Sequence, residues 1–141
     1  MSGAATATRR PAPLLATVVT VFQVIVRASG LVQITLGLLF WSGNALGLIR
    51  VHMLVGLLLV LSLWALALIG ARLGVSPALV ALALAWGLLT PALGLTQDRL
   101  LVGSGHWSIQ VAHLLVGLAA IAQAENLARR GKARLAERAS A

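Results

Sequence analysis

Two histidines that head near-identical hexads are the residues of this chain best suited to bind a cofactor. His52 begins His-Met-Leu-Val-Gly-Leu and His113 begins His-Leu-Leu-Val-Gly-Leu, so the hexads differ only at the second position. Neutral imidazole is the commonest protein ligand for metals, and two imidazoles on opposite faces of one iron complete a six-coordinate haem. The hexads therefore indicate an internal duplication or one functional constraint met twice.

A glycine follows each of these histidines at the fourth position, Gly56 after His52 and Gly117 after His113. Positions four apart lie on the same helix face. Each imidazole is therefore expected to stand beside an empty patch, which is the space that the edge of a flat macrocycle needs. The same spacing also suits a simple notch for helix packing.

The composition of the chain places these motifs in a membrane protein. Of the 141 residues, 60% are apolar and only 10% are charged, and the mean hydropathy is +0.98. A water-soluble domain of this size has too little interior to bury so much apolar surface. The chain has no cysteine, which excludes disulfides, iron–sulfur clusters and thiolate catalysis. Its three carboxylates, Asp98, Glu125 and Glu137, are too few for a hard-cation cage or a paired-carboxylate active site.

The order of apolar runs and turn signals predicts an all-α, four-helix transmembrane bundle. A membrane span takes about 20 residues, and Ser42-Gly43-Asn44 and Ala71-Arg72-Leu73-Gly74 read as turns. We expect a basic tail at 1–13, a transmembrane domain at 14–128 and a second basic tail at 129–141, for which a helix on the lipid surface is one arrangement. Within the domain the expected helices are 20–41, with 14–19 as a lead-in or a tilted extension, 48–70, 77–95 and 106–127.

The basic start of the chain has an alternative interpretation as a secretory signal. Arg9 and Arg10 would then form its charged region, and 14–26 its apolar core. We favour the first membrane helix.

The distribution of Lys and Arg predicts the orientation of the bundle. With the N-terminus in the cytoplasm, eight basic residues lie inside and only Arg50 and Arg99 lie outside. The positive-inside rule then predicts that both termini are cytoplasmic, in an integral protein of what we expect to be a bacterial inner membrane. The net charge of +8 is therefore attributed to topology and anionic lipid, and no nucleic-acid partner is expected.

The two halves of the chain show a second, weaker similarity. Leu36-Gly37-Leu38 in the first expected helix recurs as Leu93-Gly94-Leu95 in the third. Together with the hexads, this predicts two similar hairpins, helices 1–2 and 3–4, although chance also explains a match of such common residues. In that arrangement helices 2 and 4 run in the same direction, and both histidines lie roughly 6–10 Å below the outer boundary.

Three kinds of site are compatible with this placement. Two histidines at matched depth on parallel helices favour one bis-histidine haem b between them. A chlorophyll-type pigment would need only one histidine for each magnesium. Histidines that merely form hydrogen bonds between helices would bind no cofactor, although polar groups within a membrane by default suggest function.

The core at about 20–127 resembles the small membrane b-type cytochromes, including cytochrome b561-like proteins and the haem-bearing anchor subunits of respiratory complexes. The resemblance lies in four helices with paired histidines on His-x-x-x-Gly faces. It implies that His52 and His113 are axial ligands and that the role is electron transfer to or from a quinone. Many b561-like proteins carry two haems, whereas this chain has ligands for one. The resemblance therefore implies one redox subunit of a larger homo- or hetero-oligomeric assembly, not a catalytic subunit.

The remaining polar residues are expected in supporting roles. The haem propionates should face the outer water near Arg50, with Arg99 and His106 as the other basic groups there, and the redox partner or quinone should lie on that side. His106, seven residues before His113, has three open roles: contact with a cofactor edge, capping of its helix, or simple solvation.

We expect Arg27 to extend to the cytoplasmic headgroups, with a partner subunit or quinone as the alternative. A stripe of small and polar residues in the first helix suits close packing, and Gln33 within it suits a hydrogen bond to a cofactor: Ser29, Gly30, Gln33 and Gly37.

Overall fold

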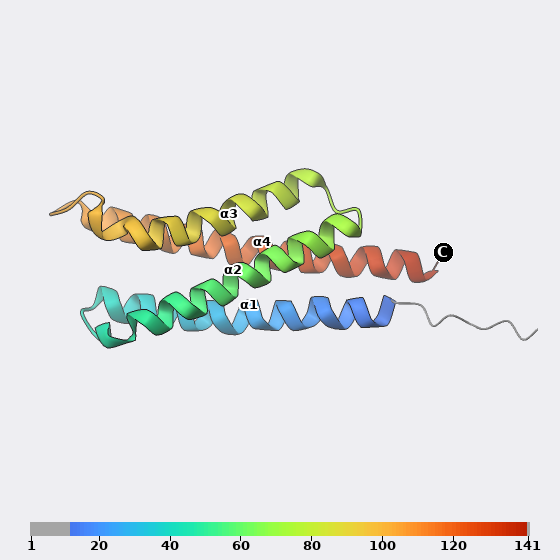
Figure 1. Ribbon diagram of the computed structural model, residues 1–141, viewed down its shortest axis with the longest axis horizontal. Coiled ribbons are helices and arrows are strands. Elements are labelled where there is room, and N and C mark those ends of the chain that lie inside the picture. The colour runs from blue at the N-terminus through green and yellow to red at the C-terminus, as the bar shows by residue number, and fades with distance from the viewer. Residues whose placement is uncertain (1–11, 141) are drawn as a thin grey trace, which may run out of the picture.

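The computed structural model describes residues 12–140, and these fold almost entirely as helix (Figure 1). Four helices within this range are long and apolar enough to cross a membrane. The sequence-based prediction of an all-α chain with four potential membrane spans is therefore confirmed. The helices are α1 (Ala12–Trp41), α2 (Ile49–Arg72), α3 (Pro77–Thr96) and α4 (His106–Ser140), with short 3₁₀ helices η1 (Leu46–Leu48) and η2 (Gln97–Arg99).

The outer surface of the bundle is covered by large apolar side chains. Leucines and valines from all four helices are more than a third exposed, and several are more than half exposed. A soluble monomer rarely shows a continuous apolar surface of this extent. The surface is compatible with a lipid bilayer, and examples from the four helices are Leu31, Leu54, Leu88 and Leu115.

Two glycines with left-handed backbone conformations end the first two helices. Gly43, at φ 76°, follows α1, and Gly74, at φ 80°, follows α2. After α1 the Asn44 N–H donates to the Leu39 carbonyl at 2.8 Å, and after α2 the Val75 N–H donates to the Gly70 carbonyl at 2.9 Å. These are the long hydrogen bonds of Schellman motifs, in which glycine avoids the steric cost of positive φ. Both expected turns are therefore present.

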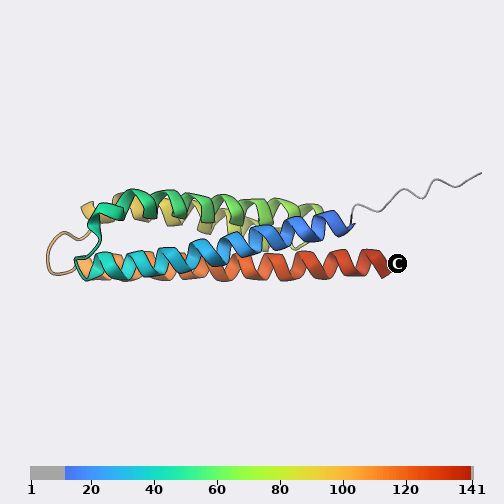
Figure 2. The ribbon, with the colours of Figure 1, turned by 90° about the horizontal axis from the view of Figure 1, so that it is seen from below.

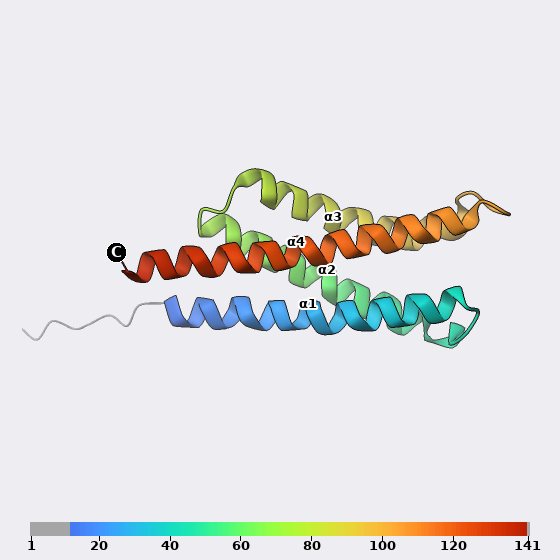
Figure 3. The ribbon, with the colours of Figure 1, turned by 180° about the vertical axis from the view of Figure 1, so that it is seen from behind.

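Figure 2 shows α2 and α3 along one side of the bundle and α4 along the other, with α1 running obliquely from the level of α2 and α3 near its start to the level of α4 near its end. In Figure 1, α2 runs obliquely from beside α1 at one end toward α3 at the other. Helices α2 and α4 each pack against all three of the other helices. Seen from behind in Figure 3, both described chain ends lie at the same end of the bundle as the α2–α3 turn.

The two ends of the bundle differ in the residues they carry. We call the end with Trp41, His52, His106 and His113 the histidine end. The opposite end, with the described chain ends and the α2–α3 turn, is called the basic end.

Small residues allow close approach of the helices in the core. Ala67, Ala83, Ala120 and Ala128 have no exposed surface. A Cβ atom added to Gly30 of α1 would lie 2.8 Å from Ile121 of α4, so these two helices touch there without room for a methyl group. Close packing over small residues is the usual source of helix association in a membrane, where lipid removes most of the hydrophobic driving force.

Two helices are longer than the sequence predicts. α1 begins at Ala12, so of the two alternatives for 14–19 the structure shows an extension of the helix. α4 continues to Ser140 without a break at 127, and its last turns pack on the α2–α3 turn through Gly131 and Leu73. The basic segment from 129 to 140 is therefore an extension of α4, whereas the sequence suggested a separate tail. The tail expected at 1–13 lies mostly outside the described residues.

Candidate cofactor site

The imidazoles of His52 and His113 lie together at the histidine end. His52 is in the first turn of α2 and His113 is two turns into α4, and their ring centroids are 6.5 Å apart. Both side chains are half-buried. Residues 61 positions apart are thus brought together by the direct packing of α2 against α4, as the sequence predicts.

This separation fits two ligands of one metal ion. Two imidazole nitrogens bound on opposite sides of a metal are about 4 Å apart, because each bond is about 2.0 Å long. Each ring centre lies roughly one ångström behind its nitrogen, which gives a separation of centres of about 6 Å. The observed distance between the ring centroids, 6.5 Å, is therefore close to that of two imidazoles bound to one metal, and the two rings are tilted by 52°.

Several buried polar atoms at this site lack hydrogen-bond partners. Within residues 12–140, Nδ1 of His52, Nδ1 of His113 and Oε1 of Gln33 are buried and unpartnered. The only other such side-chain atom in that range is Nε1 of Trp64, which packs against Gly87 of α3. Unpaired buried polar groups are rare in folded proteins and often mark a place where a water, an ion or a ligand belongs. Three of these four unpartnered atoms therefore belong to the two histidines and to Gln33, which contacts His52.

The two hexad glycines have different surroundings. A Cβ atom built on Gly117 would meet nothing within 4 Å, so this glycine faces open space. A Cβ atom on Gly56 would collide with the amide of Gln33, which also donates from Nε2 to the His52 carbonyl oxygen at 2.7 Å. The expectation of an empty patch beside each histidine therefore holds at Gly117 and is wrong at Gly56, because a side chain from α1 fills that notch.

Two further residues form walls of the site that the sequence analysis did not assign. The ring of Phe40, near the end of α1, makes an edge contact with His52 at a centroid distance of 5.3 Å. Gly94 of α3 packs on the other imidazole, since an added Cβ would lie 3.1 Å from Cε1 of His113. Gly94 belongs to the repeated Leu-Gly-Leu motif, so a signal for it was present. Its counterpart Gly37 faces open space and does not reproduce this contact.

The other predicted site residues lie nearer the rim of the histidine end. Arg50 is exposed, two residues before His52 in α2. His106 is half-buried, and its Nδ1 lies 3.2 Å from the carbonyl oxygen of Leu100. The ring of His106 therefore ties the α3–α4 loop to the start of α4. Because its partner is a carbonyl oxygen, this contact does not cap the free N–H groups of α4. Met53, the residue after His52, is exposed.

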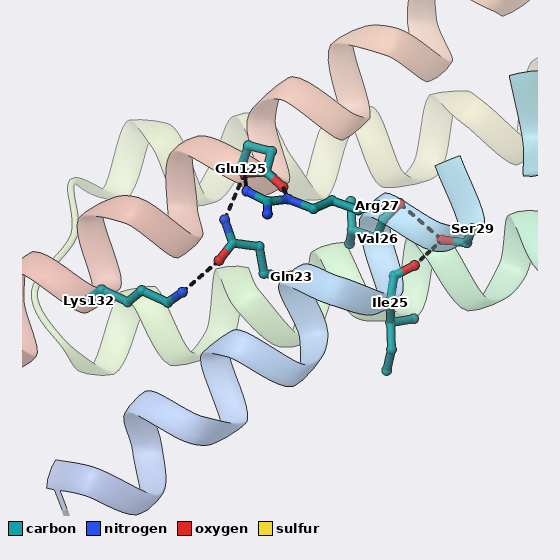
Figure 4. A network of polar contacts seen from close by, with 7 residues as sticks. All are labelled: Gln23, Ile25, Val26, Arg27, Ser29, Glu125 and Lys132. Carbon is teal, nitrogen blue, oxygen red and sulfur yellow. Dashed lines mark hydrogen bonds and ion pairs between the residues drawn. The ribbon is translucent and has the colours of Figure 1, made fainter. Parts of the chain in front are cut away.

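A polar network links α1 to α4 near the basic end, and the sequence analysis did not predict it (Figure 4). Arg27 donates from Nε and Nη2 to the two carboxylate oxygens of Glu125, at 2.7 Å and 2.8 Å. Gln23, which is buried, donates to the same carboxylate at 2.7 Å and accepts from Nζ of Lys132 at 2.7 Å. The pair with Glu125 is an intrachain partner that the sequence analysis did not assign to Arg27, whose side chain is still 63% exposed. Its expected extension to the headgroups stays a prediction. Spacing along the sequence gave no signal for a pair 98 residues apart.

Within the described range, no three His, Cys, Asp or Glu side chains gather in a group able to hold a metal ion. A haem site needs only two protein ligands, because the porphyrin supplies the other four ligands of the iron. Comparison with protein-family models, curated proteins and solved structures finds no match to this chain. The function is therefore argued from the site itself.

Proposed function

We propose that this chain is a membrane b-type cytochrome that holds one haem between His52 and His113 and transfers electrons within a larger redox assembly. The observation that carries the proposal is the pair of imidazoles from α2 and α4, with ring centroids 6.5 Å apart. Their separation suits two axial ligands, and the unpartnered buried atoms around them suit a site made for a further group.

The roles of the chain's residues follow from their positions. His52 and His113 would provide the axial nitrogens, and the open space at Gly117 would admit a macrocycle edge. Phe40 and Gly94 would hold the two imidazoles in place from α1 and α3. Bound haem supplies a one-electron couple, and two strong nitrogen ligands favour electron transfer because they leave no open position on the iron for a substrate.

The proposed orientation places the site near the outer face of a bacterial cytoplasmic membrane. Both termini would be cytoplasmic by the positive-inside rule. Arg50 is exposed close to His52 at this end of the bundle, where it would pair with a propionate. The electron partner would then be an extracytoplasmic protein or a quinone near the outer leaflet. The identity of that partner would decide whether the assembly is a homo-oligomer or a hetero-oligomer.

A cofactor-free structural role is the second candidate, and one observation favours it. Gln33 fills the notch at Gly56 and bonds to the His52 carbonyl, as a residue would in a site that only packs helices. The absorption spectrum of the purified protein, after expression with ample haem precursor, separates the candidates. A Soret band with a sharp α band on reduction supports the proposal. A red chlorin band would indicate a pigment protein, and a spectrum with no visible band even after added haem would contradict the haem proposal.

A further inference from the structure

The amide of Gln33 lies against the residue that the proposed function assigns as one axial ligand. Its Nε2 donates to the carbonyl oxygen of His52 at 2.7 Å, and the amide fills the notch at Gly56, one turn further along α2. This contact joins α1 to α2 at the histidine end. The other amide atom, Oε1, is buried and has no partner.

The chemistry of a ligating histidine requires an acceptor of this kind. When one ring nitrogen of an imidazole binds a metal, the other carries a proton, and a metal-bound histidine almost always donates that proton to an oxygen. Nδ1 of His52 is buried without a partner. Phe40, the aromatic neighbour of His52, has no side-chain oxygen. Among residues 12–140, Oε1 of Gln33 is the only buried side-chain oxygen without a hydrogen-bond partner.

We infer that Gln33 is a positioning residue that acts through His52: its Oε1, which has no partner in this structure, would turn to accept the Nδ1 proton of the imidazole once that ring binds haem. This inference rests on the proposed function. Each half of the amide then has its own role: Nε2 anchors the side chain to α2, and Oε1 fixes the tautomer of His52. A hydrogen bond of this kind makes the imidazole a stronger electron donor, which stabilises the ferric form relative to the ferrous form.

The test uses substitutions of nearly constant size at Gln33 in the full-length protein reconstituted with haem. Gln33→Met removes the acceptor and the donor, whereas Gln33→Glu keeps an acceptor oxygen. The control is Gln23→Met, the same change on the same helix near the basic end, where Gln23 contacts Glu125 and Lys132. The measurements are the midpoint potential, the low-spin ferric signal and the thermal unfolding midpoint of each variant.

The inference predicts that Gln33→Met raises the midpoint potential while low-spin haem is retained. Loss of such a partner typically changes metal affinity by about 10–100-fold, and a tenfold change in the ferric-to-ferrous ratio corresponds to about 59 mV for a one-electron couple. Gln33→Glu should stay at or below the wild-type potential. Gln23→Met should lower the unfolding midpoint without a change in potential.

Failure of the Gln33 inference and failure of the proposed haem function give different results. If the wild-type protein takes up no haem, the proposed function itself fails. If the wild-type binds low-spin haem but Gln33→Met has the wild-type potential, or Gln23→Met shifts the potential equally, the role of Gln33 is refuted and the haem site stands.

Discussion

At the scale of single residues, the proposed haem site requires that two imidazoles bind the same iron. His52 and His113 come from different helices and their rings lie 6.5 Å apart with buried, unpartnered Nδ1 atoms. His106 differs from both because its Nδ1 lies near the carbonyl oxygen of Leu100 in the adjoining loop. The same side-chain type therefore has two distinct roles within one end of the bundle.

Replacement of either proposed haem ligand should abolish the low-spin haem spectrum. His52→Ala and His113→Ala each remove one of two iron–nitrogen bonds, and the apolar surroundings offer no substitute ligand. His106→Ala is the matched control and should keep the low-spin signal, with some loss of stability in the loop. Absorption spectra of the three variants check this, and unaltered spectra in both His52→Ala and His113→Ala would rule out axial ligation.

The two hexad glycines should respond differently to the same substitution. Gly117→Leu would place a side chain in open space, so it should lower haem occupancy with little effect on the fold of the cofactor-free protein. Gly56→Leu would collide with Gln33 and should cost about 1–3 kcal/mol of stability even without haem, the usual cost of overpacking. Haem titration and thermal unfolding distinguish them, and normal haem uptake by Gly117→Leu would mean that the macrocycle does not use this space.

At the scale of helices, the bundle is held by small residues through its middle and by polar bonds at its ends. Gln33 joins α1 to α2 at the histidine end. Gln123, which is buried in α4, donates to the carbonyl oxygen of Leu79 in α3 at 2.8 Å. The network around Glu125 joins α1 to α4. These bonds fix the register of helices whose apolar faces alone are nearly uniform.

Three substitutions of the same kind should rank these bonds by their effect on thermal unfolding. Gln123→Met removes one interhelical hydrogen bond, which in a membrane is worth about 0.6 kcal/mol on average. Glu125→Met should destabilise more, because it leaves three donor groups from Gln23 and Arg27 without an acceptor. Glu137→Met is the control, since its pair with Arg134 at 3.1 Å is exposed and lies within one helix. Equal unfolding midpoints for Glu125→Met and Glu137→Met would show that the network does not hold α1 to α4.

The sequence predicted the helices better than the polar contacts between them. Long apolar runs and the glycines at 43 and 74 placed the helix ends on either side of the first two turns to within a few residues, because hydropathy and backbone sterics are local properties. The extension of α4 to Ser140 was missed because that segment is rich in basic residues, and the packing of Gly131 near Leu73 of the α2–α3 turn depends on the tertiary structure. The pairing of Arg27 with Glu125 and the filling of the Gly56 notch by Gln33 depend on how helices pack, which one sequence does not specify.

At the scale of the whole molecule, the proposal requires a definite orientation in the bilayer. Most basic residues of the described chain lie toward one end of the bundle, and the candidate site lies at the other with Arg50 and Arg99. Trp41 and Trp107 both lie at the histidine end and are both exposed, as suits an interface with water and headgroups. The proposed electron partner would then be separated from the cytoplasm by most of the bilayer thickness.

Single-cysteine labelling tests this orientation, because the natural chain has no cysteine. Ser104→Cys, in the α3–α4 loop, should react with a membrane-impermeant thiol reagent applied to the outside of spheroplasts. Ser140→Cys, at the end of α4, should react only after the membrane is permeabilised. The opposite pattern would invert the bundle and place the site on the cytoplasmic side.

The most direct test of the central claim is low-temperature electron paramagnetic resonance on the purified protein titrated with ferric haem. The account predicts uptake that saturates at one haem per chain and gives a low-spin ferric signal of bis-imidazole type. That signal requires two nitrogen ligands on the same iron, so it reports on His52 and His113 together. A high-spin signal, or no saturable uptake of haem, would contradict the assignment of this pair as a haem site.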